Sequence, residues 1–312
     1  MHIASATTEQ ERCYYCIYMV HNERSEEFVS RRYSGWNRPS PVRTKKRRPF
    51  LKLILLLMLI FTGVYGYIFL LPALSQGPSV EKTTESIDEI IKSYPEYEIG
   101  VSVMDVNSNE KIDLGEQSAF TAASTTKLLT AALTMHEIEA GKLNLDTDIN
   151  DSPVSWHLEQ MINQSNNASW KSLNDKFGKK KMENYAKSIG LNSYKHEGNS
   201  ISPKDMALLL AKLYKNKLAN KENTKIILGH MVHTNDDSFI PTIAETQDIK
   251  VYHKYGWYES NIHDVGLLVA EKSTWALAIY THPKDNDNHS TTSRDIIHKV
   301  TQATVNQLTP AP

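Results

Sequence analysis

The chain has 312 residues, a hydrophobic content of 40 %, and 35 Lys and Arg against 36 Asp and Glu, which gives a net charge of -1. This composition excludes an intrinsically disordered protein and leaves room for one sizeable domain. The charge is unevenly spread, because residues 1–49 contain ten basic and five acidic side chains whereas residues 53–312 contain 24 and 31. The acidic balance of the larger part argues against nucleic-acid binding.

A stretch of 19 residues without charge, 53–71, divides the chain. At about 1.5 Å rise per residue, a helix of this length crosses a hydrocarbon core of roughly 30 Å. The basic residues just before it are Arg43, Lys45, Lys46, Arg47, Arg48 and Lys52. They predict a single-pass helix over 50–71 in the cell membrane, with the N-terminus in the cytoplasm and the rest extracytoplasmic. A cleaved signal peptide is the alternative, but its apolar core is shorter and lies nearer the N-terminus.

The segment before this stretch, residues 1–49, has no hydrophobic periodicity and is expected to be a disordered cytoplasmic tail. It contains both cysteines, Cys13 and Cys16. A CxxC pair can be a redox pair or half of a zinc site, but neither a βαβ pattern nor a second pair accompanies it, so two free thiols are expected. Residues 72–82 contain Pro, Gly and Ser and predict a stalk, and 83–312 form the domain.

The first elements of this domain follow from periodicity. Ile87, Ile90, Ile91 and Tyr94 recur at helical spacing. Residues 99–114 then read as a β-hairpin that turns at 107–109. One helix is expected from near Ser124 to Gly141. Another is expected to begin at Ser202–Pro203, an N-cap followed by proline in the first turn.

Beyond residue 245 the pattern changes to strands, at 249–256, 265–270 and 275–281, followed by a final amphipathic helix over 293–308. Two strands early and three late, with helices between them, predict an α/β (α+β) sandwich. Its five-stranded antiparallel sheet is built from both ends of the domain, and the centre forms an all-helical subdomain.

Ser124 and Lys127 stand three residues apart, so both side chains lie on the same face of the expected helix. A lysine whose pKa is lowered can take the proton of a serine and make it a nucleophile. The helix N-terminus adds N–H groups that can stabilise an oxyanion. An SxxK pattern alone also fits an unremarkable surface pair.

Two further motifs favour the chemical reading. Ser165-Asn166-Asn167 begins 38 residues after Lys127, and Lys254-Tyr255-Gly256 lies on the first late strand. The order and spacing resemble the SxxK, SxN and K[TS]G motifs of class A β-lactamases and related penicillin-binding proteins. The resemblance covers about residues 85 to 310 and includes the segments SAFTAASTTKLL and NIHDVGLLV.

This resemblance implies catalytic roles for three residues. Ser124 would be the acylated nucleophile, Lys127 its proton acceptor, and Ser165 the group that passes a proton to the leaving nitrogen. No cofactor and no metal are expected.

The resemblance also implies a substrate-binding set. Asn167 would hold the substrate amide, and Lys254 would supply positive potential facing the Ser124 pair. The oxyanion hole would be formed by the backbone N–H groups of Ser124 and Trp257. Gly256 would let the substrate lie against the strand.

Three departures from the family pattern concern recognition. Tyr255 replaces the usual Thr or Ser, so the small hydroxyl that meets a substrate carboxylate is absent or displaced. Arg294 is the one arginine after residue 48 and lies on the last helix. Asn166 replaces the aspartate of SDN, which is a milder change.

A fourth departure concerns deacylation. Class A β-lactamases carry a long loop with a glutamate that activates water, but the corresponding loop here is LNSYKHEGNSIS. Its one acid is Glu197, the candidate deacylation base, for which a solvated loop glutamate is the alternative. Short loops of this kind are similar to those of carboxypeptidases that deacylate slowly.

The expected function is therefore that of a membrane-anchored serine hydrolase acting on β-lactams or D-Ala-D-Ala peptides through an acyl-Ser124 intermediate. The alternatives are a D-alanyl-D-alanine carboxypeptidase-like penicillin-binding enzyme and a non-catalytic cell-wall binding module with the same fold. The expected partners are a β-lactam or a peptidoglycan peptide and the cytoplasmic membrane, and not nucleic acid.

Overall fold

The computed structural model describes residues 54, 57–62, 80–287 and 289–308. The chain divides into two units, Met1–Val64 and Tyr65–Pro312. In the first unit, residues 54 and 57–62 are helical and exposed. Within the described parts of the chain, no helix has both the length and the apolar character needed to span a membrane. The predicted tail over 1–49, most of the predicted span over 50–71 and most of the stalk lie outside the described residues.

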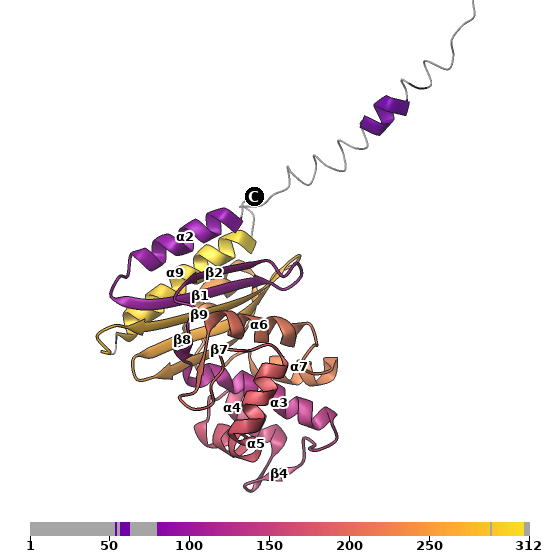
Figure 1. The fold of residues 1–312 in the computed structure, drawn as a ribbon, viewed down its shortest axis with the longest axis vertical. Helices are drawn as coiled ribbons and strands as arrows, with labels where there is room; N and C mark the ends of the chain where they lie inside the picture. The colour runs from indigo at the N-terminus through magenta and orange to yellow at the C-terminus, as the bar shows by residue number, and fades with distance from the viewer. Residues whose placement is uncertain (1–53, 55–56, 63–79, 288, 309–312) are drawn as a thin grey trace, which may run out of the picture. The chain divides into compact units, whose positions relative to one another are not determined.

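The second unit is built around a five-stranded antiparallel sheet in the order β2-β1-β9-β8-β7 (Figure 1). The strands are β1 (Tyr97–Asp105), β2 (Lys111–Gly115), β7 (Lys250–Tyr258), β8 (Asn261–Val269) and β9 (Thr274–Pro283). The prediction of a sheet made from both ends of the domain is confirmed. The strand predicted at 265–270 begins earlier, at residue 261, because it pairs along its whole length with β7.

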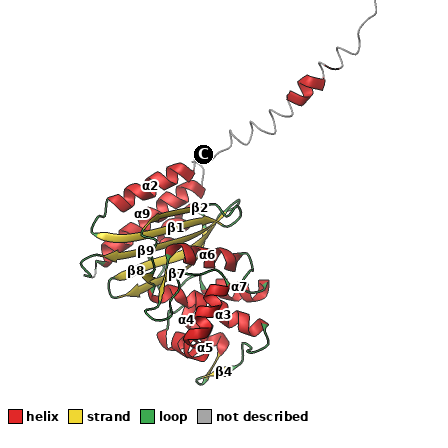
Figure 2. Cartoon of the chain, viewed as in Figure 1, coloured by secondary structure: helices red, strands yellow, loops and turns green. Residues whose placement is uncertain are grey.

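One face of the sheet is covered by the terminal helices α2 (Val80–Lys92) and α9 (Ser290–Leu308), as Figure 2 shows, and by the short helix α8 (Ile240–Ala244). Alternate residues of β1, such as Val101 and Val103, point to this side and are buried with Ile87 of α2. The predicted first helix thus exists, but it begins inside the stretch assigned to the stalk. Tyr94, just beyond it, donates a hydrogen bond to Asp295 of α9 at 2.5 Å.

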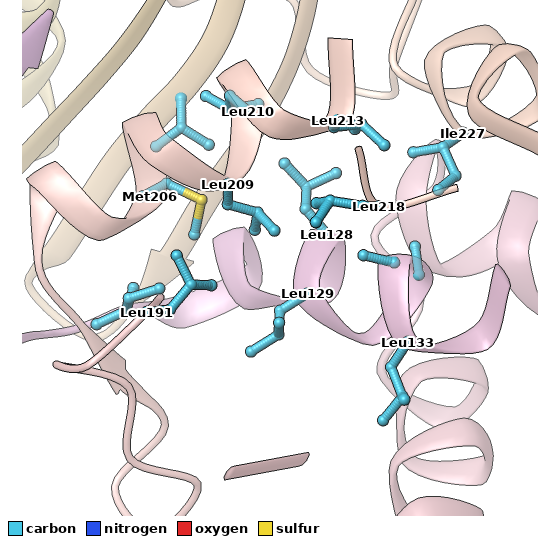
Figure 3. Packing of buried hydrophobic residues seen from close by; sticks show 14 of the residues in the cluster. Leu128, Leu129, Leu133, Leu191, Met206, Leu209, Leu210, Leu213, Leu218 and Ile227 are labelled. Carbon is cyan, nitrogen blue, oxygen red and sulfur yellow. The ribbon is translucent and has the colours of Figure 1, made fainter. Parts of the chain in front are cut away.

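The opposite face carries α6 (Pro203–Tyr214) and the helices η1 (Ala123–Thr126), α3 (Lys127–Glu139), α4 (Val154–Ile162), α5 (Asn167–Ser188) and α7 (Lys221–His230). Figure 3 shows leucines of α3 opposite leucines of α6, where Leu128, Leu133 and Leu209 are all nearly inaccessible. Each such buried side chain stabilises the fold by about 1.5–3 kcal/mol.

The predicted helical subdomain is confirmed, but it is not entirely helical, because it also contains two small two-stranded sheets. One pairs β3 (Phe120–Thr121) with β6 (Ser200–Ile201), and the other pairs β4 (Asp148–Ile149) with β5 (Ser152–Pro153). The first of them brings the segment before Ser124 beside the loop that ends at β6.

Helix α6 begins as predicted. The Ser202 hydroxyl accepts a hydrogen bond from the Asp205 N–H at 3.3 Å, and Pro203 occupies the first turn. A Cβ added to Gly100 would lie 2.7 Å from Cγ of Pro203. Helix α6 therefore rests directly on β1, which fixes the helical part against the sheet.

Candidate active site

Ser124 lies in the 3-10 turn η1 that joins β3 to α3, and its neighbours hold this turn in place. Ala123 has a φ of 50°, a left-handed conformation that is rare for residues other than glycine. The Asn199 side chain donates to the Ala123 carbonyl at 2.7 Å and accepts from the Thr126 hydroxyl at 2.6 Å. These bonds compensate the strained backbone and fix the direction of the Ser124 side chain.

The Lys127 amine is the centre of the site. Its Nζ lies 2.9 Å from Ser124 Oγ, 2.7 Å from the Ser165 carbonyl and 2.8 Å from Asn167 Oδ1. Burial of this side chain lowers its pKa to about 7. In the neutral form, two N–H groups can serve the two carbonyl oxygens while the nitrogen lone pair accepts the Ser124 hydroxyl proton. The geometry and the pKa thus fit a proton acceptor at neutral pH.

Ser165 and Asn167 come from the turn between α4 and α5. Ser165 has a φ of 54°, which directs its carbonyl to Lys127, and its hydroxyl lies 3.4 Å from the same amine. Asn166 caps α5, because its side chain accepts a hydrogen bond from the Ser169 N–H at 2.9 Å. Asparagine and aspartate cap helices about equally well, so this departure from the family pattern leaves the turn intact.

Gly256 of β7 faces η1. A Cβ at this position would lie 3.0 Å from Cγ2 of Thr125 and 3.1 Å from both the Ala122 carbonyl oxygen and Ala123 Cβ. We expected glycine here to leave space for substrate. The structure gives another reason for glycine at this position, because β7 and η1 approach so closely that a side chain between them would displace the turn that carries Ser124.

Lys254 is completely buried. Its Nζ donates to the Tyr255 carbonyl at 2.9 Å and lies 4.0 Å from the centroid of the Tyr255 ring. Burial, followed by the nearby charge of Lys127, lowers the pKa of Lys254 well below its usual value. Burial lowers the pKa of Lys127 as well, and it is the largest cause for both amines.

Tyr255 is engaged by the protein itself. Its ring stacks on Phe239, with centroids 6.1 Å apart, and its hydroxyl donates to Asn235 Oδ1 at 2.9 Å. Asn235 in turn donates to the Gln164 carbonyl at 3.2 Å. The hydroxyl that stands in the place of the family's Thr or Ser therefore links β7 to the loop that carries Ser165.

A cleft of about 740 Å³ opens at Ser124. It is lined by Thr121, Ala123, Ser124, Lys127, Asn167, Trp170, Lys171, His196, Gly198, Asn199, Trp257 and Tyr258. Trp257, 41 % exposed, is held by a hydrogen bond from Nε1 to the Glu259 carbonyl at 3.1 Å.

Trp170 could have been found from the sequence, since it stands three residues after Asn167 on the same helix. Asn199 and His196 carry no such signal, because a loop brings them to the cleft.

Glu197, the candidate deacylation base, does not belong to this lining. Its side chain is 85 % exposed and its carboxylate binds Lys179 Nζ at 2.7 Å, which lowers the pKa of Glu197. None of the described residues that line the cleft is a carboxylate. The loop turns Glu197 to solvent beside Lys179 of α5, as the alternative of a solvated loop glutamate expects.

A group of side chains able to hold a metal ion, Asp285, Asp287 and His289, occurs among the described residues between β9 and the first turn of α9. All three are exposed, and none of them lines the cleft.

Comparison with known proteins identifies the family. The model of the β-lactamase enzyme family matches residues 82–308, which is most of the chain. The protein belongs to the β-lactamase enzyme family. It is a serine hydrolase of the β-lactamase type, as the motif resemblance predicted.

Similar solved structures include PBP-A in its L158E form, an acyl-enzyme complex with penicillin G, with a TM-score of 0.67, 17 % identity and coverage of 73 % of this chain and 97 % of that one. A β-lactamase from Chitinophaga pinensis has a TM-score of 0.66, 19 % identity and coverage of 73 % and 99 %. A variant of a reconstructed ancestral class A β-lactamase of Gram-negative bacteria has a TM-score of 0.65, 20 % identity and coverage of 72 % and 97 %. At these identities the likeness concerns the fold.

Proposed function

We propose that this β-lactamase-family protein forms an ester between Ser124 and the acyl part of a β-lactam or a D-Ala-D-Ala peptide. The observation that carries the proposal is the Lys127 amine, which lies within 2.9 Å of Ser124 Oγ and is bound to Ser165 and Asn167 at the same time. A surface Ser/Lys pair would not be buried and joined to a second motif in this way.

The acylation step follows from these contacts. The Ser124 hydroxyl gives its proton to Lys127 as Oγ attacks the carbonyl carbon of the scissile amide, and the carbonyl oxygen becomes an oxyanion. The N–H groups of Ser124 and Trp257 would stabilise this charge. The proton then passes through the Ser165 hydroxyl to the amide nitrogen, whose bond to the carbonyl carbon breaks. The product is an ester on Ser124 with a neutral amine released or, in a β-lactam, still tethered.

Hydrolysis of this ester is expected to be slow. A general base must lie within hydrogen-bond reach of the attacking water. The described lining of the cleft offers no carboxylate for this role. The protein would therefore act as a penicillin-binding enzyme with slow turnover, close to the carboxypeptidase alternative. The PBP-A L158E structure, an acyl-enzyme complex with penicillin G, is an example of this fold acylated by a β-lactam.

A non-catalytic cell-wall binding module is the second candidate, and recognition of the substrate carboxylate is what favours it. The Tyr255 hydroxyl is already bound to Asn235, and the guanidinium of Arg294 lies 5.2 Å from the centroid of the Phe239 ring. Neither group is placed as a free donor in the cleft.

We also propose that the chain is anchored in the cell membrane by residues 50–71, with its N-terminus cytoplasmic. The uncharged stretch of 19 residues and the basic cluster before it support this arrangement. Alkaline carbonate washing of membranes tests it: an anchored chain stays with the pellet, whereas release into the supernatant would contradict the anchor.

Intact mass spectrometry of the purified full chain with benzylpenicillin tests the main proposal. A lasting adduct identifies a penicillin-binding enzyme, and a transient adduct with product release identifies a β-lactamase. No adduct on the wild type would reject acylation and favour the binding module. The Ser124→Ala variant is the control for attachment at any other nucleophile.

A further inference from the structure

A buried histidine on β7 joins three separate parts of the chain. His253 is 1 % exposed, and its Nδ1 lies 3.0 Å from Asp264 Oδ1 of β8. Its Nε2 lies 3.0 Å from Asp237 Oδ1 in the loop before α8. The Asp264 carboxylate also accepts the Ile240 N–H at 2.9 Å, at the start of α8. The histidine thus connects two strands of the sheet with the loop over residues 231–239.

The two ring nitrogens of His253 define its charge state. Each nitrogen faces a carboxylate oxygen, and a neutral imidazole can donate from only one of them. Nε2 also lies 3.0 Å from the Thr234 hydroxyl, but that hydroxyl donates its proton to Asp237 at 2.8 Å. In a neutral ring that donates from Nδ1, the lone pair of Nε2 would therefore lie against the Asp237 carboxylate. The doubly protonated imidazolium satisfies both Asp264 and Asp237. The pKa of His253 agrees with this. Burial alone would lower that pKa, but Asp264 and Asp237 outweigh burial and raise it to about 9.

Other charged groups near this cluster have their own partners. On β7, Lys254 donates to the Tyr255 carbonyl. In the loop, Asp236 accepts from the Ser238 hydroxyl at 2.6 Å. On α9, His298 lies 2.8 Å from the Ser238 carbonyl and Arg294 lies over the Phe239 ring.

The loop held by His253 also touches the catalytic turn. The Asn235 N–H donates to the Asn163 carbonyl at 3.2 Å, and its side chain donates to the Gln164 carbonyl, next to Ser165. Asn163 returns a hydrogen bond to the Val232 carbonyl at 3.1 Å. At the other end, the His253 N–H donates to the Met231 carbonyl at 2.9 Å. A continuous set of hydrogen bonds therefore runs from His253 to the turn that carries Ser165.

We propose that protonated His253 is a positioning residue, which clamps the 231–239 loop between β7 and the Ser165 turn and so keeps Ser165 in register with Lys127. The histidine touches neither Ser124 nor the cleft, so it acts through the loop. The kinetic part of this proposal rests on the proposed acylation of Ser124. The clamp itself is a property of the fold and can be measured without substrate.

The clamp predicts a pH dependence with a definite sign. The pKa of His253 is raised from its ordinary value of 6.5, so the stability that it contributes is complete below 6.5 and is lost as the pH rises through about 9. We expect the acylation rate constant with benzylpenicillin to fall over the same alkaline range in the wild type. In His253→Gln we expect a rate about tenfold lower at neutral pH, equivalent to roughly 1.4 kcal/mol at the barrier, and no further alkaline decline near pH 9.

Two variants keep this test sharp. Asp237→Asn removes the partly exposed carboxylate at one end and leaves Asp264, so it should fold and should move the alkaline decline to lower pH. His289→Gln removes an exposed histidine whose pKa is also raised, by Asp285, but which lies outside the network. Its pH profile should equal that of the wild type.

Amide hydrogen exchange of the full chain separates the two proposals. Protection of the 231–240 amides should fall in His253→Gln and, as the pH passes 9, in the wild type. Unchanged protection in His253→Gln, or an unmoved alkaline decline in Asp237→Asn, would overturn the clamp. Absence of an adduct in every variant would reject acylation, while loss of loop protection would still support the clamp.

Discussion

The two sides of the Ser124 cleft are built differently. On one side, η1, α3 and the start of α5 bring Lys127 into simultaneous contact with two motifs, and the lysine is 1 % exposed. On the other side, the loop before β6 carries Glu197 on a side chain that is 85 % exposed. Formation of an acyl-enzyme requires the first side and its hydrolysis requires a base on the second. If Ser124 is acylated as proposed, acylation and release depend on different groups, and the described residues of the cleft include a set suited to acylation but no carboxylate for release.

Replacement of Ser124 should have the largest effect. Ser124→Ala removes the nucleophile, so we expect the covalent benzylpenicillin adduct to disappear completely in intact mass spectra. Ser172→Ala, a change on α5 at a serine that does not line the cleft, should label like the wild type. Full labelling of Ser124→Ala would reject the nucleophile assignment and with it the account of the prepared side.

Replacement of Lys127 should have the next largest effect. Lys127→Ala removes the proton acceptor, and general base catalysis contributes about 10²–10⁴-fold. We expect acylation to slow by this factor, measured by quenching the reaction at set times and following the adduct by intact mass spectrometry. Lys212→Ala is the matched control, because Lys212 is also partly buried and hydrogen-bonded, to the Ile189 carbonyl, but lies outside the cleft.

The pH profile of the wild type tests the role of Lys127 as the proton acceptor in a second way. Because the pKa of Lys127 is lowered to about 7, the neutral amine predominates above pH 7. Acylation should therefore rise with pH through about 7 and stay level until the alkaline decline near pH 9 that is expected from His253. A profile that rises only near the ordinary pKa of lysine would show that burial does not prepare this base.

The sheet and the acylation motifs were predictable from the sequence for a physical reason. Short-range signals suffice for both: the spacing of Ser124 and Lys127 places them on one helix face, and alternating strands such as 249–256 define the late sheet. Figure 1 shows how the two ends of the domain meet in that sheet.

The rest depended on contacts between distant segments, which no local pattern encodes. The alternation of side chains along β7 predicts which face Tyr255 is on. It does not predict its partner Asn235, which lies in a loop whose path is set by tertiary packing. His253 alternates with Lys254 along β7, which indicates only that the two side chains point to opposite faces of the sheet. The two aspartates that contact its ring nitrogens come from other elements. The solvent-facing direction of Glu197 likewise follows from the conformation of its loop and its contact with Lys179.

Gly256→Ala should have a moderate effect. The added methyl group would lie 3.0–3.1 Å from Thr125, Ala122 and Ala123, and overpacking of this kind costs about 1–3 kcal/mol. We expect a lower melting temperature and acylation reduced about tenfold, the factor that corresponds to roughly 1.4 kcal/mol. Gly229→Ala is the matched control, since a Cβ there meets nothing within 4 Å. In helix α7 it should stabilise the protein by about 0.5–1 kcal/mol.

Substitution of Glu197 should have the smallest effect, and it tests the unprepared side of the cleft directly. A deacylating base has to approach the water that attacks the Ser124 ester, but Glu197 points to solvent and binds Lys179. Glu197→Gln should therefore change the lifetime of the benzylpenicillin adduct by less than about tenfold, whereas loss of a true general base would lengthen it by about a hundredfold or more. The lifetime is measured by following the adduct mass after removal of excess penicillin. Lys179→Met is the matched control, because it breaks the same ion pair and leaves the carboxylate in place. If Glu197→Gln stalls the adduct and Lys179→Met does not, the loop must swing Glu197 into the cleft after acylation, and the two sides of the site would then be equally equipped.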